Sequence, residues 1–380
     1  MNILYVGGYR DGIGYGYAAQ ENIKALHSIG CNVACRSVTF TNRKSSVDPI
    51  VLKCESKSYS KYDVVIQHSL PHYFEYVGEC GLNVGITYME TVPTPYLWKR
   101  QCSYMDLILS SDEDMSDALH KSGINNEIIP VPCDTSKYDK EIGLLPSIKN
   151  LKESGDFVFY TMGEMVQRKN LYALLKAFFS EFREDEPVKL VIKTSLGGIK
   201  KEQLFQTINN DVAKIRSGML LPPSTQQIVF LGSWLSEDEV LQFHKSCDCF
   251  IQVSHGEGFS LPAFDAMAMG NTPIVSNIGG YKNYINNDTG WLVNCRQTVC
   301  FGETPHYPEL FNGVTQTWAD PDLLQLKQCM REAYSQKNRA AKVEFGKKQI
   351  RNFSYQSIGT KMAEVLEKYV KQKREMARLT

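Results

Sequence analysis

Two carboxylates stand eight positions apart in the chain, Glu257 and Asp265, on either side of a glycine-containing turn. The apolar run over residues 249–253 predicts a buried strand, and residues 254–257 carry the chain out of its carboxyl end. An ionised carboxylate only accepts hydrogen bonds, so each acid can bind a pair of hydroxyl groups. The spacing indicates a site for a sugar nucleotide, and an ordinary strand-turn-helix with solvated acids is the alternative.

The turn leads into a helix pattern over residues 262–269, with Ser260 as the expected cap. Proline in the first helical turn supports this assignment. We expect the backbone N–H groups of Phe259, Ser260 and Leu261 to meet an anion, because a helix start attracts negative charge. Asp265 is expected in the first turn of this helix, where it shares one crevice with the other carboxylate.

A basic pair, Arg168 and Lys169, follows an expected strand over residues 157–162 and precedes an expected helix over residues 171–182. The guanidinium, the ammonium and the positive end of the helix dipole all favour an anion such as a diphosphate. Two solvated cations are the alternative. A helix start is an electrostatically poor place for them unless an anion is bound.

Glycines crowd the first strand-to-helix turn, between an expected strand over residues 2–7 and an expected helix over residues 17–28. Because glycine has no Cβ, backbone N–H groups at Gly14 and its neighbours can approach a diphosphate closely. A tight turn with positive φ would need the same glycines. The third glycine of a dinucleotide fingerprint and its ribose-binding acid are both missing, which disfavours a nicotinamide enzyme.

Two strand ends of the first half carry further polar candidates. Glu90 follows an expected strand over residues 83–88, and His68 follows one over residues 63–67. Ligands meet an open α/β sheet at such strand ends, although a lone histidine is more often structural or simply exposed. The Pro/Tyr/Trp loop over residues 93–98 can stack on a sugar ring or pack over the first domain.

The segment from Glu257 to Asp265, Glu-Gly-Phe-Ser-Leu-Pro-Ala-Phe-Asp, resembles the Glu-x7-Glu signature of the family-4 retaining glycosyltransferases. With the glycine-rich opening, the basic turn and Gly279-Gly280, the resemblance covers nearly the whole chain. It implies an α/β protein of the GT-B fold, with two Rossmann-like doubly wound domains that face each other across a cleft. The implied reaction transfers a hexose from a UDP- or GDP-linked sugar, with retention of configuration, to a glycan, lipid-linked or other hydroxyl acceptor.

The resemblance also implies roles for single residues. It places Glu257 beside the donor sugar, and Glu90 and His68 are the further catalytic candidates. The donor-binding residues are Gly14, Arg168, Lys169, Gly258, Phe259, Ser260, Leu261 and Asp265, of which Asp265 binds the ribose. Neither a metal nor a cofactor beyond the donor substrate is needed if the cations and helix starts offset the leaving diphosphate.

Four positions depart from the family pattern. Asp265 is one methylene shorter than the usual glutamate, and Ser260 stands where glycine is common. Glu164 replaces the family's first arginine, whose charge Arg168 is expected to take over. Asn283 replaces a glutamate that often follows the Gly-Gly turn.

Short β-rich runs alternate with helical stretches twice along the chain, which is the pattern of two doubly wound α/β units. Residues 138–155 form a polar, weakly periodic stretch, which predicts a linker between the two units. We expect a Rossmann-like acceptor domain over residues 1–145 and a Rossmann-like nucleotide-sugar domain over residues 146–354. Residues 355–380 read as an amphipathic helix with a basic end, which can cross back to the first domain; its basic face meets solvent or, as the minority alternative, a membrane surface.

The composition indicates a cytoplasmic enzyme. Lys plus Arg equals Asp plus Glu, 42 each, so no overall field attracts nucleic acid, and contact with a membrane is at most peripheral. The 11 cysteines, an odd number, indicate reduced thiols, and their spacing fits no standard zinc site. The start of the chain shows no signal-peptide pattern, and no run approaches the roughly 20 apolar residues of a membrane span.

Two other classes of function stay open. One is a non-catalytic GT-B protein that binds a sugar nucleotide or a glycan, to which the departures at Glu164, Asp265 and Asn283 point. The other is a GT-B enzyme with a different outcome, such as an epimerase or a transferase acting on modified DNA bases. A net charge of zero argues against a nucleic-acid substrate.

Overall fold

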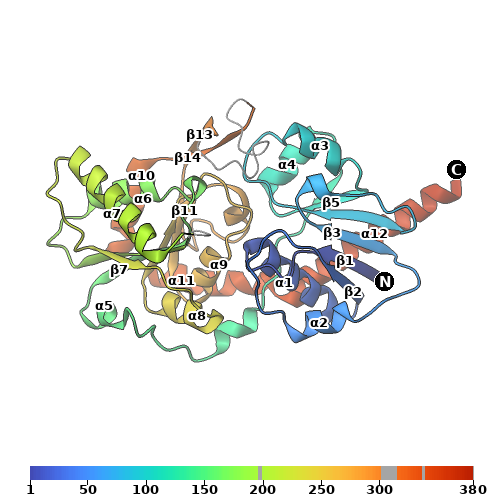
Figure 1. Cartoon of the computed structure of the whole chain (residues 1–380), viewed down its shortest axis with the longest axis horizontal. Coiled ribbons are helices and arrows are strands. Elements are labelled where there is room, and N and C mark those ends of the chain that lie inside the picture. Colours follow the sequence, from blue (N-terminus) through green and yellow to red (C-terminus); the bar gives the residue numbers. More distant parts are fainter. Residues whose placement is uncertain (196–198, 301–314, 336–338, 380) are drawn as a thin grey trace. The chain divides into compact units, whose positions relative to one another are not determined.

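A computed structural model of the chain describes residues 1–195, 199–300, 315–335 and 339–379. The chain divides into two compact units. Unit 1 comprises Met1–Lys137 together with Arg351–Thr380, and unit 2 comprises Tyr138–Ile350. Each unit contains a six-stranded sheet flanked by helices (Figure 1). All strand pairs within the two large sheets are parallel, so both units are Rossmann-like, as the sequence predicts.

The strands of unit 1 lie in the order β2-β1-β3-β4-β5-β6. Helix α1 begins three residues earlier than the expected residue 17. The elements are β1 (Asn2–Gly7), α1 (Gly14–Ser28), β2 (Asn32–Ser37), α2 (Pro49–Glu55), β3 (Val64–His68), η1 (Pro71–Tyr73), β4 (Leu82–Ile86), α3 (Tyr96–Cys102), β5 (Leu107–Ser110), α4 (Glu113–Lys121), β6 (Asn126–Ile128), η2 (Thr135–Asp139), η5 (Ile350–Phe353) and α12 (Tyr355–Leu379).

The central strand β3 shows how unit 1 presents polar groups. All five of its residues are buried, as expected for a central strand of a parallel sheet covered on both faces. Its first three residues are aliphatic, and the polar Gln67 and His68 come last. The polar groups therefore gather at the carboxyl edge of the sheet, where ligands bind in open α/β folds.

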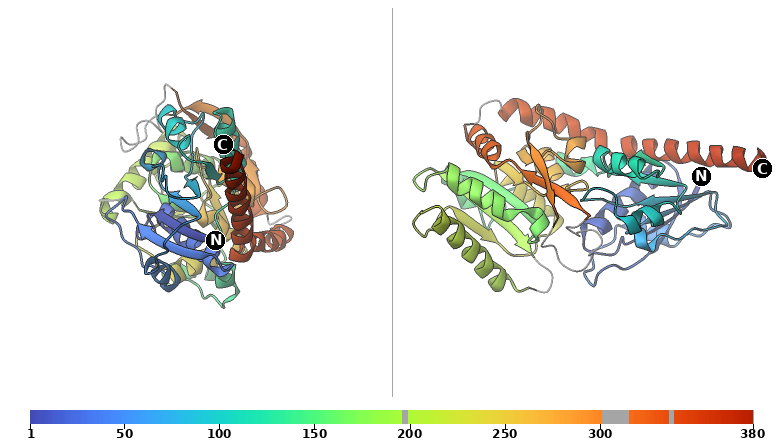
Figure 2. Two further views of the ribbon diagram at one scale, coloured as in Figure 1. Left: turned by 90° about the vertical axis from the view of Figure 1, so that its right-hand side faces the viewer. Right: turned by 90° about the horizontal axis from the view of Figure 1, so that it is seen from above.

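The last helix, α12, runs along unit 1 and packs against α1 (Figure 2). Tyr355, its first residue, donates a hydrogen bond from its hydroxyl to Glu21 Oε2 at 2.8 Å. Its basic end pairs with acids of unit 1, two of which directly precede β3 and β5. These ion pairs are Lys368 with Glu127 at 2.9 Å, Lys373 with Asp106 at 2.6 Å and Arg374 with Asp63 at 2.6 Å. Part of the basic face that the sequence predicts to meet solvent is thus bonded to the protein itself.

The strands of unit 2 lie in the order β12-β11-β10-β7-β8-β9, and β13 and β14 form a separate antiparallel hairpin. The sequence patterns predict no element between residues 276 and 355, where the structure has several. The elements are α5 (Lys149–Glu153), β7 (Phe157–Glu164), η3 (Gln167–Lys169), α6 (Leu171–Glu181), β8 (Val188–Ser195), α7 (Lys201–Gly218), β9 (Ile228–Leu231), α8 (Glu237–Lys245), β10 (Cys249–Gln252), α9 (Leu261–Ala268), β11 (Thr272–Ser276), η4 (Gly279–Asn283), β12 (Trp291–Val293), β13 (Cys295–Val299), β14 (Thr317–Pro321), α10 (Leu323–Tyr334) and α11 (Arg339–Gln349).

Aromatic rings join β7 to α6 and α10 in the core of unit 2. Phe157 and Phe159 of β7 are in edge contact with ring centroids 4.9 Å apart. Phe159 contacts Phe178 of α6 at 6.5 Å, and Phe157 contacts Tyr334 of α10 at 5.6 Å. Edge-to-face pairs of this kind add roughly 0.5–1.5 kcal/mol each beyond their buried area. They fix the two helices on one face of the sheet.

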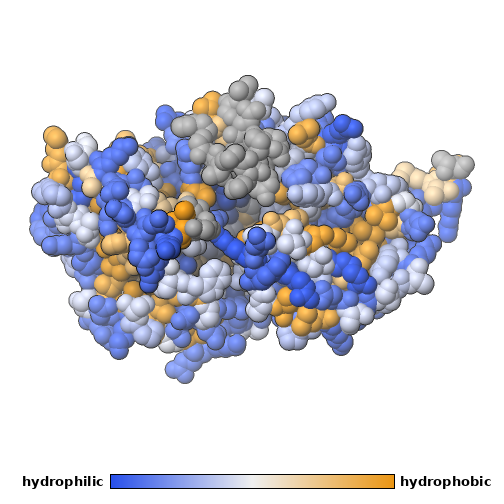
Figure 3. Space-filling model, viewed as in Figure 1, coloured by the Kyte–Doolittle hydropathy of each residue, from blue (hydrophilic) through white to orange (hydrophobic). Residues whose placement is uncertain are grey.

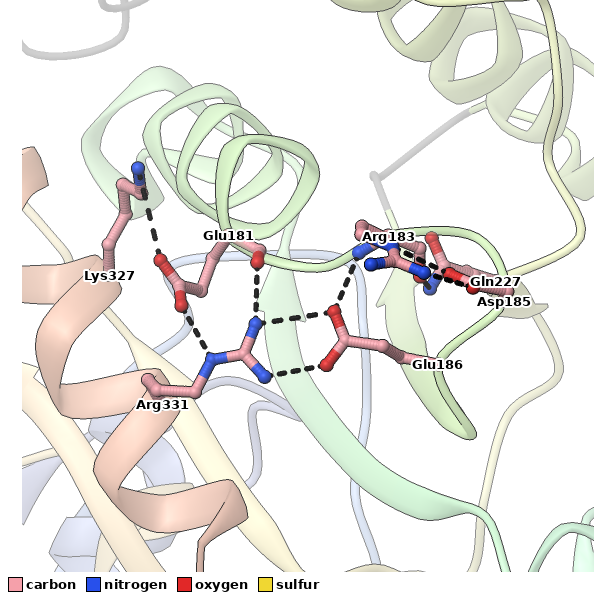
Figure 4. A network of polar contacts seen from close by, with 7 residues as sticks. All are labelled: Glu181, Arg183, Asp185, Glu186, Gln227, Lys327 and Arg331. Carbon is pink, nitrogen blue, oxygen red and sulfur yellow. Dashed lines mark hydrogen bonds and ion pairs between the residues drawn. The ribbon is translucent and has the colours of Figure 1, made fainter.

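A polar network ties α10 to the end of α6 on the surface of unit 2 (Figure 4). The Arg331 guanidinium donates to Glu181 Oε1 at 2.7 Å and to Glu186 Oε2 at 2.6 Å. It also lies over the ring of Phe182, 4.6 Å from the centroid. These hydrogen bonds with Arg331 lower the pKa of Glu186. Because one planar guanidinium bonds two carboxylates, the network restrains α6 relative to α10.

The surface face shown in Figure 3 is mostly hydrophilic, with smaller apolar areas scattered over both units. This mixture agrees with the equal numbers of basic and acidic residues. Within the described ranges, no helix combines the length and the apolar character that crossing a membrane requires.

Candidate functional site

The carboxyl edge of the unit 2 sheet brings the basic turn and the Glu257 turn together. Strands β7 and β10 are parallel neighbours, so the chain leaves both of them at the same edge. After β7 the turn η3 precedes α6, and after β10 a loop leads into α9. The backbone N–H of His255 in this loop donates to the carbonyl oxygen of Arg168 at 2.8 Å. The two loops are therefore joined through their backbones.

Both cations of the basic turn contact the carboxylate of Glu257. Lys169 Nζ donates a hydrogen bond to Glu257 Oε2. Arg168 Nη1 lies 3.6 Å from the same oxygen and donates to the carbonyl oxygen of Gly256 at 2.7 Å. The exposed fractions of the Lys169, Arg168 and Glu257 side chains are 18%, 15% and 10%, so water screens these charges weakly.

The helix start after the basic turn predicts an anion near Arg168 and Lys169. The sequence predicts a diphosphate there, and in this structure both cations contact Glu257 of the same chain. The three residues lie together at one edge of the sheet, and the alternative of two merely solvated cations is therefore wrong. The way in which they would meet a ligand stays a prediction.

Ser260 precedes α9 but does not cap it with its side chain. Its backbone has a φ of 66°, in the left-handed region that residues other than glycine seldom adopt. Ser260 Oγ donates instead to Gln252 Oε1 of β10 at 2.8 Å. The predicted serine cap is wrong, because Oγ bonds β10 rather than a helix N–H. The left-handed backbone also gives a physical reason why glycine is common at this position in the family that the sequence resembles.

Two tyrosines that the sequence patterns do not single out hold the turn in place. The hydroxyl of Tyr284 donates to the carbonyl oxygens of Phe259 at 2.7 Å and Ser260 at 2.9 Å. The hydroxyl of Tyr281 donates to Gln252 Oε1 at 2.9 Å. Both tyrosines are fully buried or nearly so. Their place three residues apart, directly after the Gly-Gly turn, is the signal that would have identified them.

The Gly279-Gly280 turn packs directly on the Glu257 loop. A Cβ on Gly279 would lie 2.2 Å from the carbonyl oxygen of Glu257, and one on Gly280 would lie 2.1 Å from that of Gly258. The N–H of Gly280 donates to the Glu257 carbonyl at 3.0 Å. Only glycine permits this approach, so the Gly-Gly turn fixes the backbone that presents Glu257 and Gly258.

Asp265 belongs to a different hydrogen-bonded group from Glu257. It is the fifth residue of α9 and therefore lies in the second turn of the helix, whereas the sequence predicts the first. Asp265 is 8% exposed, and Asp265 Oδ1 accepts a hydrogen bond from the hydroxyl of Tyr138. Tyr138 is not a predicted site residue, because it lies in the stretch interpreted as a linker. Leu261, the first residue of α9, is partly buried.

In unit 1 the predicted candidate His68 is a neutral, buried side chain. It is fully buried at the end of β3, and burial lowers its pKa to about 3. His68 Nδ1 lies 2.7 Å from the hydroxyl of Tyr5, which also accepts a hydrogen bond from Asn22 Nδ2 at 3.3 Å. Because the Tyr5 oxygen already accepts from the amide, the arrangement favours a tyrosine proton directed to Nδ1 and a ring hydrogen on Nε2. Nε2 has no hydrogen-bond partner among the described residues.

Aromatic rings surround His68 at this edge. Tyr15 and Tyr88 both have ring centroids 5.4 Å from that of His68, and Phe40 lies 6.3 Å from Tyr15. The hydroxyl of Tyr15 contacts Thr87 Oγ1 at 3.1 Å and accepts from the N–H of Tyr88 at the same distance. The carboxyl edge of unit 1 is therefore lined by rings, whereas that of unit 2 carries an ion-paired cluster.

The remaining unit 1 candidates differ in exposure and in their steric surroundings. Gly14 is exposed at the start of α1, and a Cβ there would meet nothing within 4 Å. A Cβ on Gly16 would lie 2.0 Å from the carbonyl oxygen of Asp11, so the steric need for glycine falls at Gly16. Glu90 is partly buried after β4. In the loop over residues 93–98, Trp98 is fully buried and packs in unit 1, whereas Tyr96 is 81% exposed, so stacking of this loop on a sugar stays a prediction.

Three aspartates outside the candidate site serve structural purposes. Two Asp-x-Asp triplets occur, and Asp112 and Asp322 within them cap α4 and α10, while Asp320 pairs with Arg296. Across the described residues no group of three or more His, Cys, Asp or Glu side chains is arranged to hold a metal ion. The cysteines are free thiols, as predicted. Burial raises the pKa of Cys249 in the core strand β10, which keeps this thiol protonated.

Residues 147–299 match the family model described as "Glycosyl transferases group 1". A curated relative, the alpha-monoglucosyldiacylglycerol synthase of Streptococcus pneumoniae, is 25% identical over 199 residues, which cover 48% of this chain and 40% of that protein. The serotype-specific mannosyltransferase WbdA of Escherichia coli is 27% identical over 150 residues, which cover 39% of this chain and 16% of that protein. The chain thus matches less than half the length of either relative.

Solved structures resemble the chain over nearly its whole length. Sucrose-phosphate synthase from Thermosynechococcus elongatus has a TM-score of 0.66 at 14% identity and covers 97% of this chain and 98% of its own. Anabaena HepE in complex with UDP-glucose has a TM-score of 0.64 at 15% identity and covers 97% of this chain and 100% of its own. These likenesses show the GT-B fold that the sequence predicts.

Proposed function

We propose that the chain is a metal-independent, retaining glycosyltransferase of family 4. It moves a hexose from a UDP- or GDP-linked sugar to a hydroxyl of a glycan, a lipid-linked or another acceptor. The observation that carries this proposal is the contact of Lys169 and Arg168 with Glu257. The family match over residues 147–299 includes all three residues and supports it, as do the names of the relatives.

The basic turn stabilises the leaving group in this proposal. When the bond between the anomeric carbon and the diphosphate oxygen breaks, negative charge grows on the diphosphate. Arg168 and Lys169 offset this charge, because both cations are held beside Glu257 at the carboxyl edge of the sheet. Backbone N–H groups of the segment Gly258–Leu261 at the start of α9 add to this effect. Preorganised donors of this kind usually contribute most to such catalysis, and no metal or resident cofactor is needed.

The two carboxylates recognise the donor. Glu257 accepts hydrogen bonds from the hydroxyls of the sugar, next to the atoms that react. Asp265 accepts hydrogen bonds from the ribose. The Tyr138 hydroxyl donates to Asp265 Oδ1 and so helps to fix the direction of this shorter side chain.

Unit 1 supplies the remaining candidates. We assign Gly14 to the diphosphate and Glu90 to the acceptor or the donor sugar, since the first is exposed and the second is only partly buried. We assign His68 the role of a hydrogen-bond donor through Nε2–H, because its Nδ1 is bonded to Tyr5. The reaction belongs to the cytoplasm, with at most peripheral contact with a membrane.

Calorimetry with UDP, GDP and their hexose conjugates tests the proposal. We expect binding of at least one diphosphate nucleotide, and slow hydrolysis of its sugar conjugate in the absence of an acceptor. Binding of the conjugate without any hydrolysis would favour a binding protein that does not turn over. No binding at about 1 mM, the weakest affinity of practical interest, would overturn the assignment.

A further inference from the structure

A groove with a volume of about 830 Å³ lies in unit 2 between the start of α6 and the β13–β14 hairpin. Its lining includes Asn170, Tyr172 and Lys176 on one side and Trp318 and Asp320 of the hairpin on the other. The donor-binding residues proposed above are not among the described residues that line it. This volume is sufficient for a small organic ligand, so the groove is a second candidate site.

Asn170 carries a hydrogen-bond donor that lacks an acceptor. Its Nδ2 is buried and has no partner among the described residues. Asn170 has a φ of 53°, a conformation that asparagine tolerates better than most residues, but its side chain makes no capping bond to α6. The backbone thus explains the residue type and leaves the buried amide unexplained. Asn170 is among the residues that line the groove, so a rotation of its side chain toward the groove would let the amide donate to an oxygen atom of a ligand.

The other groups of the groove suit a saccharide. The ring of Tyr172 is 45% exposed and offers an apolar face. The side chains of Gln167 and Asn294, both exposed, add amide groups that donate and accept hydrogen bonds. Sugars combine a C–H face that packs on an aromatic ring with hydroxyls that both donate and accept. A lining of one exposed ring and several amides matches that combination.

The charges of the groove are already engaged, which argues against a phosphate ligand. Arg296 Nη2 bonds to Asp320 Oδ2 at 2.9 Å. Asp322 Oδ1 accepts from the N–H groups of Leu324 and Gln325 at the start of α10. Lys176 Nζ lies over the ring of Tyr172, 5.6 Å from its centroid. A neutral ligand disturbs none of these contacts, whereas a phosphate would need cations released from them.

The hairpin wall of the groove is connected to the proposed transfer site. The rings of Trp318 and His255 stack 4.5 Å apart at 14°. His255 Nδ1 donates to the carbonyl oxygen of Ala319 at 2.6 Å, and the N–H of Ala319 donates to the carbonyl oxygen of His255 at 2.9 Å. His255 is two residues before Glu257. A ligand that contacts the hairpin is therefore one packed layer away from the loop that presents Glu257.

We infer that this groove is a saccharide-binding subsite, separate from the nucleotide site, that holds a glycan arm of the acceptor or of the product. Its role in transfer rests on the proposed function, but the binding itself does not. The polar network around Arg331 restrains α6 against α10 (Figure 4), so that one wall is in place before a ligand arrives. Preorganisation of this kind favours affinity, because only a small part of the binding free energy is lost in ordering the wall.

Saturation-transfer NMR on the full chain tests the inference, with maltotriose and an α-linked mannotriose as probes and inorganic phosphate as the contrasting probe. We expect one of the trisaccharides to bind, and its signal to persist when UDP and GDP are added in excess. Asn170→Gly keeps the left-handed backbone and removes the amide, and Tyr172→Ala removes the exposed ring. Each is expected to weaken binding at least about tenfold, which corresponds to about 1.4 kcal/mol.

Phe345→Ala is the matched control, since Phe345 is a 55% exposed ring of unit 2 outside the groove. It should leave binding unchanged. Absence of trisaccharide binding at about 10 mM, competition by UDP or GDP, or wild-type affinity in the two groove variants would overturn the inference. So would binding of phosphate that both variants abolish. Because no turnover is measured, failure here leaves the glycosyltransferase proposal intact, and failure of that proposal leaves this binding result interpretable.

Discussion

Units 1 and 2 each bury a chain of hydrogen-bonded side chains that consists of an asparagine, a tyrosine and a histidine. Only in unit 1 does the histidine lie at the carboxyl edge of the sheet, where the candidate site residues are. There Asn22 donates to Tyr5, whose hydroxyl meets His68 Nδ1 at 2.7 Å. Tyr5 lies in the first strand of its unit, β1, and His68 is the last residue of β3.

The chain in unit 2 has the same chemistry in a different place. Asn271 Nδ2 donates to the Tyr160 hydroxyl at 2.8 Å, and this hydroxyl lies 2.7 Å from His244 Nδ1. Tyr160 lies in β7, the first strand of unit 2, but His244 belongs to α8, which leads into the amino end of β10. It is therefore remote from the carboxyl edge where Glu257 lies.

The difference teaches that such a chain does not by itself indicate catalysis. His244 serves as a buried structural partner, and the same bonds around His68 are open to the same interpretation. What distinguishes His68 is its position at a strand end. What distinguishes the edge of unit 2 is charge, since Lys169 and Arg168 contact Glu257 there.

The charged edge of unit 2 should show the largest effect. We expect Glu257→Gln to lower kcat by about 10²–10³-fold, because the amide replaces one acceptor oxygen by a donor and leaves Lys169 without its carboxylate. Steady-state kinetics with the donor identified by calorimetry measures this. Glu344→Gln, at an exposed position on α11, is the control and should keep wild-type rates. Wild-type turnover in Glu257→Gln would show that this edge is not the reacting site.

Loss of either cation at this edge should lower kcat by no more than the loss of the Glu257 carboxylate. Lys169→Ala and Arg168→Ala remove charge that opposes the leaving diphosphate, so we expect kcat to fall by roughly 100-fold in each. The affinity for acceptor should change little. Lys214→Ala, at an exposed position on α7, is a matched control for the loss of a cation from unit 2 and should keep wild-type rates. Unchanged turnover in either cation variant would assign it to holding the loop instead.

The paired substitutions His68→Gln and His244→Gln test the comparison most directly. Each removes an imidazole bonded to a buried tyrosine, so both should destabilise the protein, by about 1–3 kcal/mol. If His68 has the proposed role, only His68→Gln also lowers turnover. Equal stability losses with full activity in both variants would make the two chains equivalent and remove His68 from the site.

The pH dependence of stability offers a second readout for His68. Its pKa is lowered to about 3 by burial, whereas an unfolded histidine titrates near 6.5. Below about pH 6.5 the unfolded chain therefore binds a proton that the folded chain refuses, and stability falls as the pH drops toward 3, by up to about 1.4 kcal/mol per pH unit. Urea unfolding between pH 4 and 7 should show a shallower slope in His68→Gln than in wild type. An identical slope would contradict the buried neutral ring.

The smallest expected effect is that of Tyr138→Phe. This change removes the hydrogen bond to Asp265 Oδ1 and keeps the ring. We expect the KM for the donor to rise about three- to tenfold with kcat unchanged, since one hydrogen bond contributes about 0.5–1.5 kcal/mol. Asp265→Asn should have the same direction and be larger. A change in kcat without a change in KM would mean that Tyr138 acts on the reacting atoms rather than on the ribose.

The fold and the grouping of the site could be predicted where the signal is local. The strand before Glu257, the helix after it and the basic turn before α6 all follow from apolar runs and turn residues. That Lys169 and Glu257 touch was not predictable, because it depends on β7 and β10 being neighbours in the sheet. Sequence distance, 88 positions here, conceals such contacts.

Other features were missed because their causes lie in tertiary structure. Serine is a frequent helix cap, but the backbone of Ser260 is left-handed and its hydroxyl bonds to Gln252 instead. Tyr138 lies in a polar stretch, and only the fold brings it to Asp265. The hairpin formed by β13 and β14 was not predicted, because short strands with polar residues on both faces lack a clear alternation of apolar and polar residues.

Helix α12 has a consequence for the order in which the protein can fold during synthesis. Its cations reach Asp63, Asp106 and Glu127, residues made more than 200 positions earlier. The sequence of unit 1 is therefore interrupted by the whole of unit 2. Folding of unit 1 cannot be completed until α12 leaves the ribosome, and until then the surface that binds α12 stays uncovered. Unit 2 is a single continuous segment. The half of the protein that begins second in the sequence is thus the first that can be completed.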